Sequence, residues 1–304
     1  MSERLGYMLL AIVWMCWGLS YPATAIALGS MDVWTSRVLV MPISGAALLL
    51  VVVLQGGSLR IPRIYWRDMA ILAIANMSIF QICMTSGVAL MSPGRTAVII
   101  YTMPIWATFF AVFLLGERVK WPHVAGLCLG VSGLALLMSQ DLSNLTNAPL
   151  GAALTLCASI SFAFGTVWMK RRTWHVDLTA FGGWQILVGW LPIGAIWLFV
   201  SPDNAFARVE TPGWLAIAYL AFCANALAYF AWFRVVTIFP ATVSGIGTLV
   251  VPCIGVLSSA LVVGEMLGWR DFAALGLICS ALALVVLVPA YRNHRTAAKA
   301  RRAA

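Results

Sequence analysis

The chain has 304 residues, of which 62% are hydrophobic and only 10% are charged. Soluble domains carry roughly 25% charged residues, so this composition excludes an ordinary soluble protein and favours a polytopic membrane protein. The net charge of +9 would suit a nucleic-acid-binding protein, but the placement of the cations in short loops indicates membrane topology instead.

Ten apolar stretches follow one another, with connections too short for a soluble domain. A transmembrane helix needs about 20 mostly apolar residues, and unpaired backbone is costly in lipid, so each stretch is predicted to be a spanning helix. The first stretch is too long for the core of a cleaved signal peptide and is expected to be retained. The predicted spans are residues 5–28, 32–54, 67–90, 94–115, 121–139, 149–169, 178–200, 212–233, 241–263 and 270–289.

Lys and Arg are distributed unevenly between the two sides of these spans. With the N-terminus in the cytoplasm, fifteen fall on the inner side and three on the outer side. This bias predicts that both termini are cytoplasmic, with residues 290–304 as a basic tail. Arg37 lies inside the second span, where we expect it to extend to the outer surface and pair with Asp32.

The second half of the chain repeats the first at an offset of 148 residues. Each copy holds five spans, and an odd number of spans forces the second copy to enter the membrane from the opposite side. The sequence therefore predicts two inverted units, residues 1–147 and 148–289, with a substrate site between them at the midplane. The matching positions are Pro104 with Pro252, Gly116-Glu117 with Gly264-Glu265, and Trp121 with Trp269.

Pro104 and Pro252 lie in the middle of predicted spans. A mid-helix proline removes a backbone hydrogen bond and kinks the helix, so the pair is expected to shape the wall of a cavity; a packing kink without a ligand is the alternative. Glu117 and Glu265 fall at helix ends, where capping or a surface salt bridge is expected rather than proton transfer.

These repeated prolines and Gly-Glu pairs, together with Trp17-Gly18 in the first span and Phe164-Gly165 in the sixth, resemble the drug/metabolite transporter superfamily. More narrowly, the chain is similar to bacterial EamA-type exporters. The resemblance implies an all-α bundle of ten helices, with helices 1, 3, 4, 6, 8 and 9 around a central cavity, and export of small metabolites. In its abundance of Trp, the chain is similar to the branch of this superfamily that exports aromatic amino acids.

The ionisable residues exclude several classes of protein. All ten acidic residues and all three histidines fall in loops or at helix ends. Proton-coupled carriers and intramembrane hydrolases need such groups at membrane depth, so neither a proton antiporter nor an enzyme is predicted. The seven cysteines lack metal-binding or redox spacing, and no metal or cofactor is expected. One arginine within a span is insufficient for a sugar-phosphate carrier.

Aromatic and neutral polar residues at depth form the candidate substrate site. Such a lining suits a neutral or zwitterionic ligand that stacks on rings. Tyr21 and Trp168 occupy matching repeat positions and are candidate gates, with interfacial aromatic belts as the alternative; for the Asn and Gln residues the alternative is interhelical bonding. The candidates are Trp17, Tyr21, Asn76, Gln81, Tyr101, Trp168, Asn225 and Tyr229.

The function predicted from these residues is export of small amphipathic metabolites, with aromatic or other apolar amino acids foremost, by alternating access. Efflux of hydrophobic drugs and a non-transporting membrane scaffold stay open as alternatives. The expected partners are a small-molecule substrate and membrane lipid, without nucleic acid, and the chain is expected to be a monomer or a homodimer.

Overall fold

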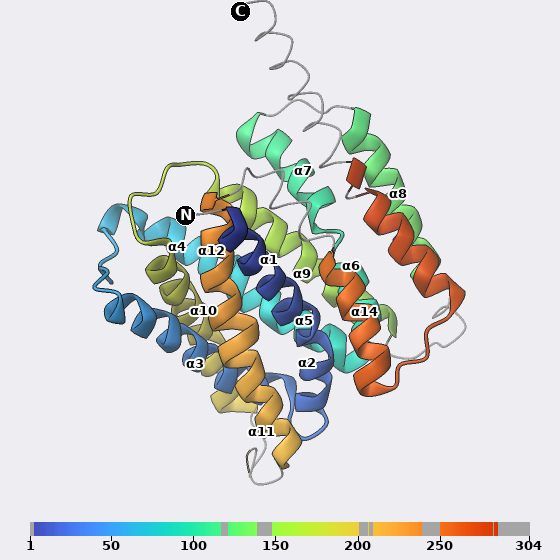
Figure 1. The fold of residues 1–304 in the computed structure, drawn as a ribbon, viewed down its shortest axis with the longest axis horizontal. Helices are drawn as coiled ribbons and strands as arrows, with labels where there is room; N and C mark the ends of the chain where they lie inside the picture. The colour runs from blue at the N-terminus through green and yellow to red at the C-terminus, as the bar shows by residue number, and fades with distance from the viewer. Residues whose placement is uncertain are drawn as a thin grey trace, which may run out of the picture.

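A computed structural model describes residues 3–116, 121–138, 148–200, 206, 209–238, 250–281 and 283–284. These ranges are almost entirely helical and contain no strand (Figure 1). The apolar stretches form helices because a helix satisfies every backbone group within one segment. The fold is therefore all-α, as predicted. The expected connection at 140–149 lies largely outside the described ranges, as does the whole basic tail, so the predicted unit boundary stays a prediction.

The first half of the chain forms α1 (Glu3–Gly18), α2 (Ser20–Leu28), α3 (Val33–Leu54), the short η1 (Arg63–Tyr65), α4 (Trp66–Leu72), η2 (Ala73–Ile79), α5 (Phe80–Leu90), α6 (Pro93–Ile100), α7 (Met103–Leu115) and α8 (Trp121–Met138). The second half forms α9 (Ala148–Met169), α10 (Leu178–Val200), α11 (Thr211–Ala218), η3 (Tyr219–Leu227), α12 (Ala228–Ile238) and α14 (Val250–Val263). Residues 269–281 are also helical.

Seven helical stretches of the described ranges are long and apolar enough to cross a membrane. Several consist of consecutive helical elements, such as α4, η2 and α5 within Arg63–Leu90. Two shorter apolar helices, Val124–Gly133 and Val250–Val263, fall within two further predicted spans. The chain is thus a multi-pass membrane protein, whereas the count of ten stays a prediction.

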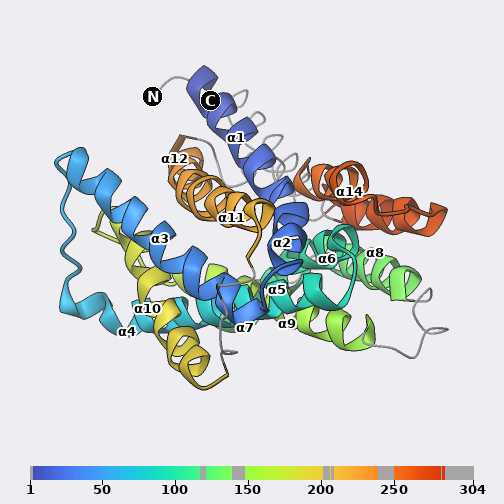
Figure 2. The ribbon, with the colours of Figure 1, turned by 90° about the horizontal axis from the view of Figure 1, so that it is seen from below.

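The two halves of the chain interdigitate. α1 packs against α12 and α14, α6 packs against α14, and α3 packs against α10 and η3 (Figures 1 and 2). Gly18 of α1 allows the contact with α14, because a Cβ at this position would clash with the side chain of Ile254. The glycine of the Trp17-Gly18 pair therefore serves close helix packing.

Each half of the chain contains a π-helical segment, which is wider than an α-helix, at a matching place. η2 and η3 are π-helical, and residues 73–79 fall on 221–227 at the repeat offset of 148. A π-helical turn leaves backbone carbonyls without their usual partners and is frequent at functional sites. Side-chain hydrogen bonds join η2 to two other helices: Ser161 of α9 donates one of 2.8 Å to the carbonyl of Ala75, and Ser78 of η2 donates one of 2.7 Å to the carbonyl of Gly189 in α10.

The span that contains Pro104 is interrupted directly before this proline, whereas its role in shaping a cavity wall stays a prediction. The predicted span divides into α6 and α7 at Tyr101–Thr102, and Pro104 occupies the first turn of α7. Amides of a first helical turn have no acceptor within the helix, so the missing N–H of proline costs nothing there. Pro252 is the third residue of α14, and residues 239–249 before that helix lie outside the described ranges.

The glycines of the two Gly-Glu pairs share one backbone conformation. Gly116 follows α7 with φ 68°, and Gly264 follows α14 with φ 70°. Positive φ is strained for residues with a Cβ, so glycine is required to end each helix in this way. The repeated glycine therefore has a structural explanation. The carboxylate of Glu117 lies outside the described ranges.

Candidate functional site

Gln81 joins the two halves of the chain in the interior of the bundle. Its side chain is 4% exposed and lies between α3 and η3. Its Oε1 accepts a 3.0 Å hydrogen bond from Nη1 of Arg37, and its Nε2 donates one of 3.3 Å to Oδ1 of Asn225. Asn225 in turn donates to the carbonyl of Leu220 at 3.0 Å. Three side chains far apart in sequence thus form one buried polar chain.

Arg37 contradicts the expectation that it reaches the outer surface. Its side chain is among the largest that are fully buried, at 1% exposure, and its Nη2 donates a 3.1 Å hydrogen bond to Oγ of Ser36. Asp32 caps α3 instead, accepting hydrogen bonds from the amides of Trp34 and Thr35 at 2.8 and 3.0 Å. The carboxylate is therefore engaged by the helix start, and the guanidinium points into the bundle.

Trp17 forms an aromatic wall beside this polar chain. Its Nε1 donates a 3.1 Å hydrogen bond to the carbonyl of Ala224, the neighbour of Asn225 in η3. Its ring meets Tyr229 edge-on at 5.9 Å and Trp232 at 5.5 Å between centroids. Trp17 and Tyr229 also share one apolar cluster with side chains of α3 that flank Arg37. Four predicted site residues, Trp17, Gln81, Asn225 and Tyr229, are therefore brought together.

Asn76 lies at the contact between η2 and α9. A Cβ on Gly165 would clash with Oδ1 of Asn76, so the glycine of the Phe164-Gly165 pair makes room for this amide. Oδ1 is buried and has no hydrogen-bond partner in the described part of the chain. Asn76 thus occupies a buried position of its own.

Tyr21 and Tyr101 belong to another apolar cluster, formed by buried residues of α2, α5, α6, α9, α14 and the helix after α14, and Trp17 also packs against it. Both tyrosines are 5% exposed. The helices approach closely here, because a Cβ on Gly255 would lie 2.9 Å from Cβ of Ala97 and 3.2 Å from Cδ2 of Tyr21. The end of the bundle where α2, α6 and α14 meet is therefore tightly packed, and we call it the closed end.

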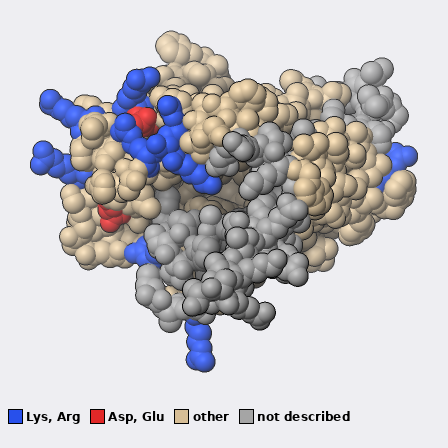
Figure 3. All heavy atoms as spheres, turned by 90° about the horizontal axis from the view of Figure 1, so that it is seen from above, with Lys and Arg blue, Asp and Glu red and all other residues tan. Residues whose placement is uncertain are grey.

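Trp168 lies near the ends of α4 and α9, apart from Trp17 and Gln81. Its Nε1 donates a 3.0 Å hydrogen bond to Asp68, and the guanidinium of Arg171 lies 4.3 Å from its ring centroid. Arg172 forms a 3.1 Å ion pair with Asp68. On the face drawn in Figure 3, Lys and Arg gather mainly toward the left, and the surface is hollowed near its middle.

The model of the EamA-like transporter family matches this chain twice, at residues 4–139 and 149–287. The chain belongs to this family. This EamA protein is 25% identical to the uncharacterized transporter YvbV of Bacillus subtilis over 91% of its own length and 90% of that protein. It is 30% identical to the uncharacterized inner membrane transporter YedA of Escherichia coli K12, over 64% and 62% of the two chains. A probable amino-acid metabolite efflux pump of the same strain is 25% identical, over 63% and 67%. Relatives are named as transporters rather than enzymes.

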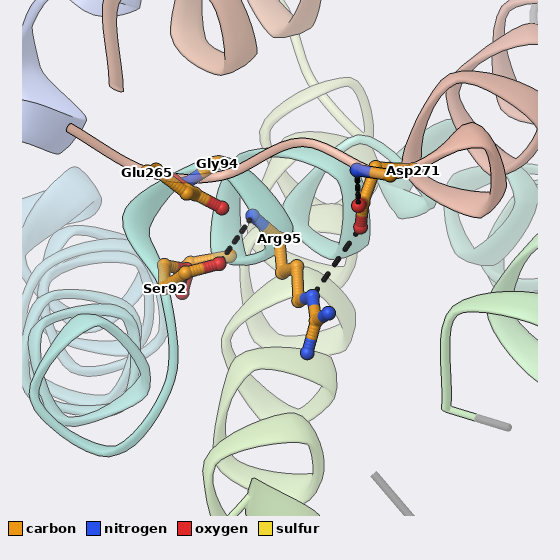
Figure 4. Close-up of polar contacts among 7 residues, drawn as sticks. Ser92, Gly94, Arg95, Glu265 and Asp271 are labelled. Atoms are coloured by element: carbon orange, nitrogen blue, oxygen red, sulfur yellow. Dashed lines mark hydrogen bonds and ion pairs between the residues drawn. The ribbon is translucent and has the colours of Figure 1, made fainter. Parts of the chain in front are cut away.

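The two halves of this EamA protein are also linked at the closed end (Figure 4). Glu265 accepts a 2.9 Å hydrogen bond from the amide of Gly94 in the first turn of α6. Next to it, Nε of Arg95 lies 3.3 Å from Oδ1 of Asp271, whose Oδ2 accepts from the amide of Gly268 at 2.8 Å. Glu265 thus caps a helix of the other half, and the capping prediction holds for this residue.

Sequence patterns of this EamA protein do not predict two parts of this arrangement: the direction of Arg37 and the contacts of Glu265 and Arg95. One signal for Arg37 was available: Asp32 precedes it by five residues, which places the two on different faces of a helix. Pairing between them was therefore unfavourable. The contacts of Glu265 and Arg95 had no such signal, because their partners are 171 and 176 residues away.

Proposed function

We propose that this EamA protein is an inner-membrane secondary transporter that exports small amphipathic metabolites, with aromatic or other apolar amino acids foremost. The observation that carries the proposal is the buried polar chain of Gln81 and Asn225 beside the rings of Trp17 and Tyr229. An aromatic wall beside amide groups suits a ligand with one apolar and one polar end.

The position of this cluster supports transport between inverted repeats. Gln81 belongs to the first half of the chain, whereas Asn225 and Tyr229 belong to the second. A site shared between halves changes its access when the halves rock against each other. Opening at the end closed by α2, α6 and α14 would separate Glu265 from Gly94 and Arg95 from Asp271.

Coupling to an intramembrane carboxylate is not part of the proposal. The acidic residues within the described ranges lie at helix ends or in turns, where several cap helices or pair with cations. They are Glu3, Asp32, Asp68, Asp177, Glu210, Glu265 and Asp271. We therefore propose facilitated transport or exchange, driven by the gradient of the substrate itself.

Growth of cells that overproduce the chain tests this proposal against drug efflux. We expect increased tolerance of toxic aromatic amino-acid analogues such as p-fluorophenylalanine, compared with the empty vector, and unchanged tolerance of lipophilic cationic dyes. Raised tolerance of the dyes alone would support drug efflux. A scaffold role is favoured if the protein is present in the membrane but tolerance of the analogues and of the dyes both stay unchanged, and if substitutions at Gln81 and Asn225 alter only stability.

A further inference from the structure

The charge of Arg37 is unusual for its position. The guanidinium stays protonated at neutral pH, and its side chain is 1% exposed between membrane-spanning helices. Its hydrogen bonds go to Ser36 and Gln81, which are neutral. Nε is buried without a partner among the described residues. A buried cation that lacks an opposite charge is costly, so a compensating anion would bind here favourably.

The orientation of Gln81 follows from the chemistry of arginine. A guanidinium carries only donors, so Gln81 must present its Oε1 to Arg37 and its Nε2 to Asn225. Asn225 then accepts from Gln81 and donates to Leu220. Every hydrogen-bond acceptor in this series of side chains, from Arg37 to Asn225, is thus a neutral oxygen. Gln81 occupies Nη1, and Ser36 accepts from one of the two N–H groups of Nη2. The N–H of Nε and the second N–H of Nη2 remain, and together they suit a carboxylate that accepts two hydrogen bonds.

The surroundings of Arg37 define the rest of the ligand. Val38 and Met41, its neighbours on α3, belong to the same apolar cluster as Trp17 and Tyr229. A molecule whose carboxylate meets Arg37 therefore has rings available for an apolar side chain. A lipophilic cation would instead be repelled by this guanidinium, which no anion among the described residues contacts.

We infer that Arg37 is the binding site for the carboxylate of the substrate, so that this carrier selects amphipathic carboxylates over the corresponding amides and amines. The inference rests on the proposed function and adds the charged group that its substrate must carry. Because Arg37 is buried in this conformation, the carboxylate reaches it when the halves of the protein separate, and its charge compensates that of the guanidinium.

Competition in reconstituted vesicles tests the inference. Proteoliposomes preloaded with phenylalanine take up labelled phenylalanine in the presence of unlabelled phenylalanine, 3-phenylpropionate, phenylalanine amide or phenethylamine. We expect the two carboxylates to compete at least roughly 30-fold better than the amide and the amine, since a charge-assisted bidentate pair is lost. Equal competition by all four compounds would overturn the inference.

Variants of Arg37 separate charge recognition from folding. Arg37→Gln should reduce the preference for carboxylates to within about threefold, whereas Arg37→Lys should keep part of it. Arg63→Gln, which removes an exposed cation beside Trp66, is the matched control and should leave the preference unchanged. A full preference retained in Arg37→Gln would contradict the inference.

A binding measurement covers the remaining outcomes. If the wild-type protein exchanges no amino acid, the proposed function fails, but quenching of Trp fluorescence by 3-phenylpropionate and by 3-phenylpropionamide still reports selectivity in detergent. Tighter binding of the acid would then support the carboxylate site on its own, and equal affinities would overturn it. The same comparison on the wild-type protein decides the matter if Arg37→Gln does not fold.

Discussion

Nε1 of Trp17 donates a 3.1 Å hydrogen bond to the carbonyl of Ala224, a residue 207 positions later in the chain. Ala224 lies in η3, where the π-helical turn changes the usual backbone pairing. The indole thus satisfies a backbone group of the other half and presents its ring to Tyr229. One side chain ties the two repeats together at the aromatic wall of the proposed site.

Replacing Trp17 by alanine should weaken binding of phenylalanine by roughly 3- to 30-fold, because stacking and cation–π contacts are lost, with insertion into the membrane unchanged. Trp17→Phe should retain more of the affinity than Trp17→Ala, since it keeps a ring. Counterflow of a panel of amino acids measures both variants. Normal transport of every amino acid by Trp17→Ala would show that Trp17 does not line the site.

Gln81→Glu places a carboxylate beside Arg37. The internal charge should then compete with the substrate, so affinity for phenylalanine falls at least about tenfold, and more than affinity for phenylalanine amide. Gln81→Met, of similar size but neutral, is the control and should keep the preference for carboxylates. A larger loss of the preference for carboxylates in Gln81→Met than in Gln81→Glu would show that hydrogen bonding, rather than charge, governs selection.

Gly165→Ala should destabilise the protein by about 1–3 kcal/mol, because the new Cβ would clash with Oδ1 of Asn76 and the helices must move apart. A matched control exists at Gly276, where an added Cβ meets nothing within 4 Å. Thermal unfolding in detergent compares the two variants. Asn76→Ala should rescue part of the loss in Gly165→Ala; equal midpoints for Gly165→Ala and Gly276→Ala would contradict the packing found here.

Glu265→Ala combined with Asp271→Asn should weaken the closed end, because the cap on Gly94 and the pairing with Arg95 are both lost. We expect faster labelling by a membrane-impermeant maleimide of a cysteine placed at Ala97, in a variant without the native cysteines. The same cysteine with Glu265 and Asp271 intact is the reference. Unchanged labelling rates would argue that these contacts do not hold this end closed.

Much of the fold was predictable because it follows from hydropathy and repetition. Apolar length gave the helical segments, and the shared spacing of Gly116 and Gly264 corresponds to matching helix ends. Pro104 predicted an interruption of its span but not its form, because proline fits both a kink and a first turn. Hydropathy also did not predict the π-helical turns or the hydrogen bonds that join η2 to α9 and α10.

The site was predictable only in part. Gln81 and Asn225 stand out as amides in apolar segments, whereas the direction of Arg37 does not follow from sequence. α3 is apolar on most sides, so its pattern does not indicate which face points inward. The residues that meet there, Arg37, Gln81 and Asn225, are separated by 44 and 144 positions, and only tertiary packing brings them together.

The most direct test of transport is uptake of labelled phenylalanine into proteoliposomes preloaded with unlabelled phenylalanine, at equal pH on both sides. We predict counterflow without a proton gradient. Among the described residues that are hydrogen-bonded around Gln81, Arg37 is the only ionised group, so the proposed site holds no carboxylate that could carry a proton. No counterflow in vesicles that contain folded protein, or counterflow only when a pH gradient is imposed, would contradict an uncoupled amino-acid carrier.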